Sequence, residues 1–356
     1  MAADAVLLIA FGGPTRPEEV APFLANVVRG RGVPPERLAE VARHYHAIGG
    51  RSPLGTITFA QAEKLGAALE EAGVPLPVYV GMRNWEPYVA HTLARMADEG
   101  RHEAIGLILA PHATEASRAR YTDAVGRGAA ALGTRAPVIR WAPDWHTHPR
   151  FIAAAAELAA TAIARLPADR RAAAVLVFTA HSVPRAMAAG SPYEAEIAAS
   201  ARAVAERLGH RAWQIAYQSR SGGSAEPWLE PDVNDALRAL AAAGARDAVL
   251  VAIGFVADHV EVLYDLDVEA AATAHAAGLG FVRAPTVNDH PLFIRMLADV
   301  VREAARWGGS RSWAAAWPDS PRRSAWSRPA AASRSCCSRR RTVSAARSRA
   351  RGPTAS

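Results

Sequence analysis

Three carboxylates in residues 255–269 form the strongest chemical pattern in the sequence. This segment follows an apolar run typical of a buried strand. If a helix starts after Asp258, then Glu261, Asp265 and Glu269 stand at i, i+4 and i+8 on one helical face. Like charges stacked in this way destabilise a helix, whereas neighbouring carboxylates bind cations or relay protons. The spacing therefore predicts a metal site or a proton path, with His259 beside it.

The same residues also fit an ordinary helix start. Asp258 is a favoured N-cap residue, and Glu261 three positions later completes a capping-box pattern. Acidic residues in a first turn also complement the helix dipole, which would leave Asp265 and Glu269 on a solvated face. A partner elsewhere in the chain is needed to separate the two hypotheses.

His181 is the partner that the sequence offers. It stands in Thr179-Ala-His-Ser-Val-Pro184, which follows the strand-like Val175–Phe178 and is broken by its proline. A lone loop histidine is often only structural. A neutral imidazole, however, can accept a proton near pH 7 and can also ligate iron.

Eight short apolar runs alternate with longer amphipathic segments, which favours the α/β class: two doubly wound, Rossmann-like domains with parallel sheets and a cleft between them. Polar or Gly-rich loops follow several of the runs, where ligands bind in such sheets. The predicted strands are Val6–Ala10, Val78–Gly81, Ala104–Leu109, Val138–Trp141, Ala174–Phe178, Ala212–Tyr217, Ala248–Ile253 and Gly280–Val282. The predicted helices are Phe59–Ala72, Pro87–Asp98, Arg150–Ala164, Tyr193–Leu208, Val233–Ala243 and Pro291–Arg306.

Composition divides the chain into three parts: two domains, 1–148 and 149–308, and a basic tail, 309–356. The tail holds eleven arginines and one acid, so residues 1–308 carry 30 basic and 33 acidic residues, a net charge of −3. Half of the residues are hydrophobic, yet no apolar run reaches the roughly 18 residues of a membrane span. We therefore expect a soluble, cytoplasmic protein that does not bind nucleic acid.

Several cofactor classes lack their sequence signatures. The Gly pairs at 12–13 and 222–223 do not have GxGxxG spacing, and no Walker motif is present. The two cysteines, Cys336 and Cys337, are adjacent in the tail, so residues 1–308 supply no thiolate ligands and no disulfide. We expect no iron–sulfur cluster.

An ordered set of segments resembles the ferrochelatases, lyases that insert Fe²⁺ into a porphyrin in haem biosynthesis. The set covers about residues 4–305. The matching segments are Leu7-Leu-Ile-Ala-Phe-Gly-Gly-Pro14, His46-Ala-Ile-Gly-Gly-Arg-Ser-Pro-Leu54, Leu109-Ala-Pro-His112, Phe178-Thr-Ala-His-Ser-Val-Pro184, Tyr217-Gln-Ser-Arg-Ser-Gly222, Glu226-Pro-Trp-Leu-Glu-Pro-Asp232 and Gly254–Glu269.

The resemblance implies that His181 and Glu261 face each other across the porphyrin and handle iron and protons, as base or as metal ligands. His259, Asp265 and Glu269 match the acidic surroundings of that glutamate and imply a path for protons or metal. The positions implied to contact the porphyrin are Ser52, Tyr121, Tyr45 and Phe11. Some soluble relatives carry a tyrosine at the position of Phe11, and that tyrosine can reach the iron. The phenyl ring of Phe11 cannot ligate a metal and can only pack against the macrocycle.

The substrate implied by the resemblance to the soluble bacterial type is coproporphyrin III, with protoporphyrin IX as the alternative. A chelatase for cobalt or nickel would use the same residue types. From another class, a non-enzymatic tetrapyrrole or metal carrier fits the same fold. Apart from Fe²⁺ as substrate, no cofactor is expected.

The tail admits a reading in another frame. Because tryptophan has the single codon TGG, Trp313-Ala314 must contain GGC, and Trp317-Pro318 must contain GCC. With G- and C-rich codons, residues 311–338 can then read as a strand, a GxGxxG turn, a helix and a strand ending in an acid. This resembles the start of a flavin-dependent porphyrinogen oxidase, which would be a partner encoded downstream. The other hypothesis is a disordered basic arm.

Overall fold

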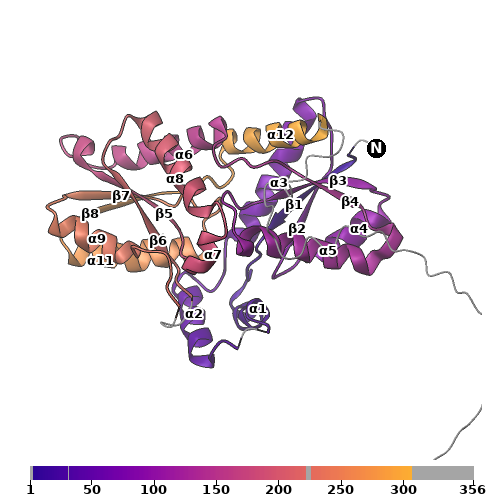
Figure 1. The fold of residues 1–356 in the computed structure, drawn as a ribbon, viewed down its shortest axis with the longest axis horizontal. Helices are drawn as coiled ribbons and strands as arrows, with labels where there is room; N and C mark the ends of the chain where they lie inside the picture. Colours follow the sequence, from indigo (N-terminus) through magenta and orange to yellow (C-terminus); the bar gives the residue numbers. More distant parts are fainter. Residues whose placement is uncertain (1–2, 31, 222–225, 307–356) are drawn as a thin grey trace, which may run out of the picture. The chain divides into compact units, whose positions relative to one another are not determined.

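The structure, a computed structural model, describes residues 3–30, 32–221 and 226–306. Its eight strands form two four-stranded sheets in which every pairing is parallel (Figure 1). The first sheet has the order β2-β1-β3-β4 and the second the order β6-β5-β7-β8. All eight predicted strands and the α/β class are confirmed. The strands are β1 Ala5–Ala10, β2 Val78–Met82, β3 Glu103–Ile108, β4 Val138–Trp141, β5 Val175–His181, β6 Trp213–Gln218, β7 Asp247–Val251 and β8 Gly280–Ala284.

The two sheets share one winding pattern. In each, the chain passes from the first strand to a neighbour on one side and then crosses to the other side for the last two strands. The order therefore reverses between β1 and β3 and again between β5 and β7. Loops at the carboxyl ends of strands diverge at such a switch point and leave room for a ligand.

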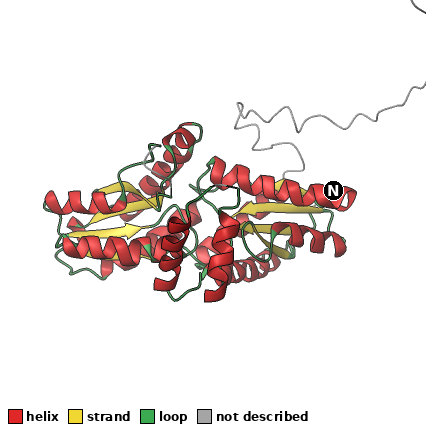
Figure 2. Ribbon diagram, turned by 90° about the horizontal axis from the view of Figure 1, so that it is seen from below, coloured by secondary structure: helices red, strands yellow, loops and turns green. Residues whose placement is uncertain are grey.

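Helices cover both faces of each sheet (Figure 2). The α-helices are α1 Val20–Val27, α2 Pro35–Ala47, α3 Leu54–Glu71, α4 Val89–Asp98, α5 Arg120–Leu132, α6 Pro149–Ala164, α7 Arg185–Ala189, α8 Tyr193–Leu208, α9 Val233–Ala242, α10 Val260–Leu263, α11 Ala271–Ala276 and α12 Pro291–Arg306. Strand residues alternate between the two faces: Val6 and Leu8 join one apolar cluster, whereas Leu7 and Ile9 join another. Burial on both faces explains why the strands read as continuous apolar runs.

One apolar cluster joins the two sheets. It includes Leu8 from β1 and Phe178 from β5, together with the alanine-rich side of α6. Helix α12 packs on both α3 and α6, so the last helix returns to the first sheet (Figure 1). The buried side chain of Gln61 donates through Nε2 to Asn288 O at 2.7 Å. All described residues belong to one compact unit.

The predicted capping box at Asp258 is wrong. The Asp258 carboxylate instead accepts hydrogen bonds from Arg283 at 3.0 Å and Asn288 at 2.9 Å. His259 takes the N-cap position of α10 without a side-chain capping bond. The helix is also not continuous: α10 is followed by a π-helical turn, Asp265–Ala270, and then α11.

Strand β5 is longer than predicted. His181 is its last residue rather than a loop residue, because it pairs in register with Gln218 of β6. The two tail hypotheses, a frameshifted oxidase start and a basic arm, concern residues outside the described part of the chain.

Candidate active site

The switch point of the second sheet brings the two predicted catalytic residues together. His181 ends β5, and the loop after β7 leads directly into α10, which carries Glu261. These two strands are neighbours in the sheet and end at the same edge. His181 Nε2 lies 3.5 Å from Glu261 Oε1. The sequence separation of 80 residues is therefore closed by topology alone.

Glu261 faces a second imidazole. Its other oxygen, Oε2, lies 3.5 Å from His259 Nε2. The ring of His181 is oriented from its far side, where Nδ1 lies 2.5 Å from the backbone carbonyl of Ser182. A carbonyl only accepts hydrogen bonds, so Nδ1 carries the hydrogen and Nε2 points at the carboxylate.

Charge pairing sets the protonation state of the two residues. Burial would lower the pKa of His181, but the charge and hydrogen bond of Glu261 raise it to about 9. Burial would raise the pKa of Glu261, yet His181 and His259 hold it well below its ordinary value. About a third of each side chain is exposed, 30% for His181 and 33% for Glu261. At pH 7 the resting pair is thus an imidazolium and a carboxylate that solutes can reach.

The loop after β6 positions the acidic residues. Gln218 donates through Nε2 to the backbone carbonyl of Glu261, and Ser219 donates through Oγ to the Asp265 carboxylate. Ser219 adopts φ 63°, a left-handed conformation that serine seldom takes. Strained backbone of this kind is typical of active sites.

The predicted ridge of carboxylates is partly assembled by the π-helical turn. Burial raises the pKa of Asp265 to about 7, Ser219 opposes this, and the charges of Glu261 and Glu269 add to it. The pKa of Glu269 is raised too, by burial first and then by other carboxylates. Asp267 turns away and pairs with Arg283 at 2.6 Å. Glu261 and Glu269 therefore both act on Asp265, whereas Asp267 does not belong to the group.

Two tyrosines from helices that flank the first sheet feel the charge of Glu261. Burial raises the pKa of Tyr121 to about 12, Arg83 lowers it, and Glu261 raises it. Burial, followed by the charge of Glu261, also raises the pKa of Tyr45 above its ordinary value. Phe11 follows β1 and packs edge-on against Phe23 with ring centroids 6.4 Å apart. The structure thus brings Tyr45 of α2 and Tyr121 of α5 within electrostatic range of Glu261.

Ser52 is buried beside the turn that follows β1. It is 6% exposed, its N–H donates to Pro14 O at 2.8 Å, and its Oγ accepts from Leu54 N at 3.3 Å. A Cβ added at Gly13 would meet the Ser52 side chain at 2.8 Å, which explains the glycine. In this structure Ser52 fixes the turn after β1.

Arg83, just after β2, was missed by the sequence reasoning. Its guanidinium lies 5.2 Å from the ring centroid of Phe11 and 5.3 Å from that of Tyr121, so it joins two predicted porphyrin contacts by cation–π interactions. Its position at a strand exit was the available signal. Gln218 and Ser219 belong to one of the segments that resemble the ferrochelatases. Nothing in the sequence indicates that Gln218 binds the carbonyl of Glu261 or that Ser219 binds the carboxylate of Asp265.

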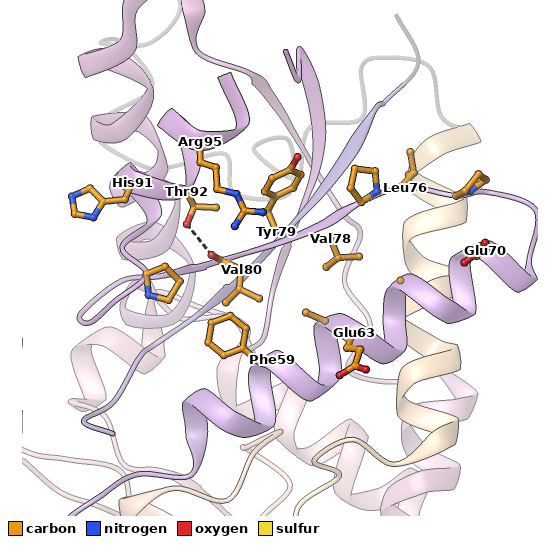
Figure 3. Close-up of a pocket in the computed structure, with 15 residues that line it drawn as sticks. Phe59, Glu63, Glu70, Leu76, Val78, Tyr79, Val80, His91, Thr92 and Arg95 are labelled. Carbon is orange, nitrogen blue, oxygen red and sulfur yellow. Dashed lines mark hydrogen bonds between the residues drawn. The ribbon is translucent and has the colours of Figure 1, made fainter. Parts of the chain in front are cut away.

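A groove of about 890 Å³ lies beside the first sheet, between α3 and the edge strand β2 (Figure 3). Phe59 and Glu63 rise from α3 on one side, and Arg95 of α4 stands on the other. Thr92 closes part of the strand edge by donating to Val80 O at 2.8 Å. None of the predicted site residues lines this groove.

Residues 3–305 match the family model described as Ferrochelatase. The chain belongs to the ferrochelatase family. It is 44% identical over 306 residues to the coproporphyrin III ferrochelatase of Mycolicibacterium smegmatis, covering 85% of this chain and 90% of the relative. The relatives of that name from Mycolicibacterium paratuberculosis and Nocardia farcinica are 46% and 44% identical, each covering 88% of the relative and 84% or 85% of this chain. The chain is therefore an enzyme of metal insertion into a porphyrin, with Fe²⁺ as substrate.

Solved structures of other chelatases share the ferrochelatase fold seen here. SirB from Bacillus subtilis with Fe³⁺ aligns with a TM-score of 0.53 at 12% identity, covering 85% of this chain and 95% of that chain. CbiX, described as the terminal enzyme of sirohaem biosynthesis in denitrifying bacteria, aligns with a TM-score of 0.50 at 18% identity, covering 84% and 99%. These likenesses confirm the chelatase-type fold. None of the helices in the described ranges has the length and apolar character needed to cross a bilayer.

Proposed function

We propose that this ferrochelatase inserts Fe²⁺ into coproporphyrin III to give Fe-coproporphyrin III in haem synthesis. The relatives with 42–46% identity that carry this substrate in their names support the choice. The observation that carries the chemistry is the His181–Glu261 pair at the switch point, 3.5 Å apart and partly exposed.

His181 and Glu261 are proposed to handle both the metal and the protons. Metallation replaces two pyrrole protons of the porphyrin by one Fe²⁺, so two protons must leave. The resting His181 is protonated and accepts nothing, but an approaching dication repels the imidazolium proton and lowers its pKa. The displaced imidazolium proton passes to Glu261 and on to solvent. If the neutral imidazole is the base, it accepts the two pyrrole protons in turn and passes each through Glu261 to solvent; if it ligates Fe²⁺, Glu261 accepts the two protons instead. With one imidazole and one carboxylate, the pair leaves metal positions open for the porphyrin nitrogens.

His259, Asp265 and Glu269 are proposed to carry protons or metal between Glu261 and solvent. Asp265 has a pKa of about 7, so it gains and loses a proton at nearly equal cost at neutral pH. Glu269 is exposed and marks the outer end of the ridge. His259 lies at the other side of Glu261 and is 16% exposed.

Phe11, Tyr45, Tyr121 and Ser52 are proposed to border the porphyrin. Phe11 is partly exposed and offers a flat apolar surface. Tyr45 and Tyr121 are 4% and 6% exposed, so their contact with the macrocycle requires side chains around them to move. A bent porphyrin exposes its nitrogen lone pairs, and a rigid aromatic wall helps to hold that shape.

A further proposal concerns the domain organisation of the chain. We propose that residues 1–148 and 149–308 act as two chelatase-like domains around the porphyrin, supported by their identical sheet topology. Cytoplasmic location and the absence of an iron–sulfur cluster remain predictions from composition.

Anaerobic metallation assays test the function. Purified protein is mixed with Fe²⁺ and either coproporphyrin III or protoporphyrin IX, and the porphyrin absorption bands are followed. Many turnovers per protein, faster with coproporphyrin III, are expected. A higher kcat/KM with protoporphyrin IX would reverse the substrate assignment, and binding of one equivalent without turnover would indicate a carrier. Co²⁺ and Ni²⁺ in place of Fe²⁺ test the other metals.

The frameshift in the tail is a proposal about the gene rather than the fold. DNA sequencing across codons 305–312, with the downstream bases, decides it. A downstream open frame that encodes a flavin-dependent porphyrinogen oxidase is expected. An intact frame with no such sequence would refute the frameshift and leave the basic-arm hypothesis.

A further inference from the structure

A buried polar cluster next to the active site takes no part in the proposed chemistry. It contains His112, from a loop after β3, and Glu196 and Ser200, from α8. His112, Glu196 and Ser200 are 2%, 7% and 0% exposed. Polar groups buried to this degree are costly unless their hydrogen bonds are made, so their geometry is strongly constrained.

The cluster fixes α8 to the loop after β3. Ala113 N donates to Glu196 Oε2 at 2.6 Å. His112 Nε2 lies 3.0 Å from Ser200 Oγ, and that hydroxyl lies 2.8 Å from the carbonyl of His146. The carbonyl accepts the single hydroxyl hydrogen, so His112 donates through Nε2 and Ser200 accepts. These bonds join residues that are 83 and 88 positions apart in the sequence. They hold α8 against the loop that follows β3.

Burial favours the neutral forms of His112 and Glu196 in this cluster. The pKa of His112 is lowered to about 3, first by burial and then by His146 and Arg118. The pKa of Glu196 is raised by burial, opposed by the bond from Ala113 and by Arg118. His112 is therefore neutral at pH 7, a state in which Nε2 can carry the hydrogen that it donates to Ser200.

The first residue of α8 reaches the active site. The hydroxyl of Tyr193 donates to the backbone carbonyl of His181 at 2.9 Å. That carbonyl belongs to the last residue of β5, so the hydroxyl of Tyr193 holds the backbone at the strand end. The ring of Tyr193 also packs edge-on against His112, with centroids 6.3 Å apart.

We propose that Glu196 is a positioning residue for metal insertion. It fixes α8, and Tyr193 at the start of α8 then holds the backbone of His181, so that Nε2 faces Glu261. Two anchors define the imidazole: the carbonyl of Ser182 on the ring and the hydroxyl of Tyr193 on the backbone. Neither Glu196 nor Tyr193 needs to touch iron or porphyrin for this role. The inference rests on the proposed role of His181.

Four variants of the full chain test the inference. Glu196→Leu removes the acceptor for Ala113 N at similar volume, and Glu196→Gln keeps one. Tyr193→Phe breaks only the last link. Asp247→Asn is the matched control, because Asp247 is also a buried carboxylate of the second half, 2% exposed, but pairs with Arg170 at the opposite end of β7. Thermal unfolding and anaerobic kcat and KM are measured for each.

Glu196→Leu and Tyr193→Phe are each expected to lower kcat about tenfold or more, because small misplacements of a reacting group are costly. KM for the porphyrin stays within about twofold. Glu196→Gln is expected to restore most of kcat, and a Glu196→Leu/Tyr193→Phe double variant to lose little more than either single variant. Asp247→Asn lowers the melting temperature but leaves kcat unchanged.

Two results would overturn the inference: near-normal kcat in either Glu196→Leu or Tyr193→Phe, or a kcat loss that simply follows the melting temperature across all four variants. If Glu196→Leu does not fold, Tyr193→Phe still decides, because a near-normal kcat in that variant breaks the link from α8 to His181. His181→Ala separates this outcome from failure of the proposed function. If that variant keeps turnover, the role of His181 is wrong, whereas an inactive variant beside normal Tyr193→Phe rejects only the positioning role.

Discussion

Glu261 lies between two imidazoles, with Oε1 3.5 Å from His181 Nε2 and Oε2 3.5 Å from His259 Nε2. One carboxylate thus serves two potential proton carriers. Since His181 alone ends a strand and has its far nitrogen bonded to a backbone carbonyl, it is the more rigid of the two. A fixed imidazole beside a charge-balancing carboxylate suits a reaction that exchanges two protons for one dication.

His181→Ala is expected to abolish iron insertion, lowering kcat about 10³-fold or more, because both the base and the metal ligand are lost. Porphyrin binding should stay within a few-fold, since the aromatic wall remains. Stopped-flow metallation and fluorescence quenching by the porphyrin measure the two effects. His275→Ala, at an exposed histidine of α11, is the control and should change neither. Retained turnover in His181→Ala would remove this residue from the mechanism.

The pH profile should report the His181–Glu261 pair. With a pKa of about 9, His181 in the free enzyme is mostly protonated at pH 7, and only the neutral form acts as base or ligand. We expect kcat/KM to rise about tenfold per pH unit and to level off near pH 9. In Glu261→Gln the raising charge is gone and burial lowers the pKa, so the plateau should begin at lower pH.

The same pair also predicts how stability depends on pH. Activity should rise with pH, whereas the contribution of His181 to the free energy of unfolding should fall. Because the pKa of His181 is raised on folding from 6.5 to about 9, its contribution to the free energy of unfolding is fully present below pH 6.5 and is lost as the pH rises through about 9. Denaturant unfolding at pH 6 and pH 10, compared with His181→Ala, measures it. Equal pH dependence in both proteins would contradict the charged pair.

Much of this site was predictable because its signals are local and repeated. Each strand is an apolar run, and each functional motif follows one, so topology places His181 near Glu261 without any knowledge of side-chain contacts. The capping box failed for a physical reason. Asp258 has the same local sequence whether its carboxylate caps its own helix or binds Arg283, which lies 25 residues further on.

Other features have no local signature. The π-helical turn at Asp265–Ala270 differs from an α-helix by one residue per turn and leaves apolar spacing almost unchanged. The bond from Tyr193 ends on the carbonyl of His181, and a backbone acceptor exists at every residue, so no side-chain pattern indicates it. Helix α2 was missed because it is polar, with one buried residue, Tyr45, along its length.

The carboxylate ridge predicts graded effects. Asp265→Asn should lower kcat more than Glu269→Gln, because Asp265 is close to Glu261 and has a pKa of about 7, whereas Glu269 is exposed. About tenfold and about threefold are expected, below the ~10²–10⁴-fold of a direct general acid or base, because both residues act through Glu261. Both losses should depend on pH or on the metal offered. Asp267→Asn is the control from the same turn, since Asp267 pairs with Arg283 instead. Equal, pH-independent kinetics in all three variants would favour a merely solvated face.

Gly254 predicts a coupling between stability and catalysis. A Cβ there would lie 2.7 Å from the backbone Cα of Ala180, one residue before His181. Gly254→Ala should therefore push the end of β5 away, lowering the free energy of unfolding by about 1–3 kcal/mol and reducing kcat as well. Gly66→Ala is the matched control in α3, because its added methyl meets only Val78 at 3.9 Å. That variant should gain about 0.5–1 kcal/mol with unchanged kcat. Denaturant unfolding and metallation rates of both variants check the pair, and a normal kcat in a destabilised Gly254→Ala would show that the strand end tolerates displacement.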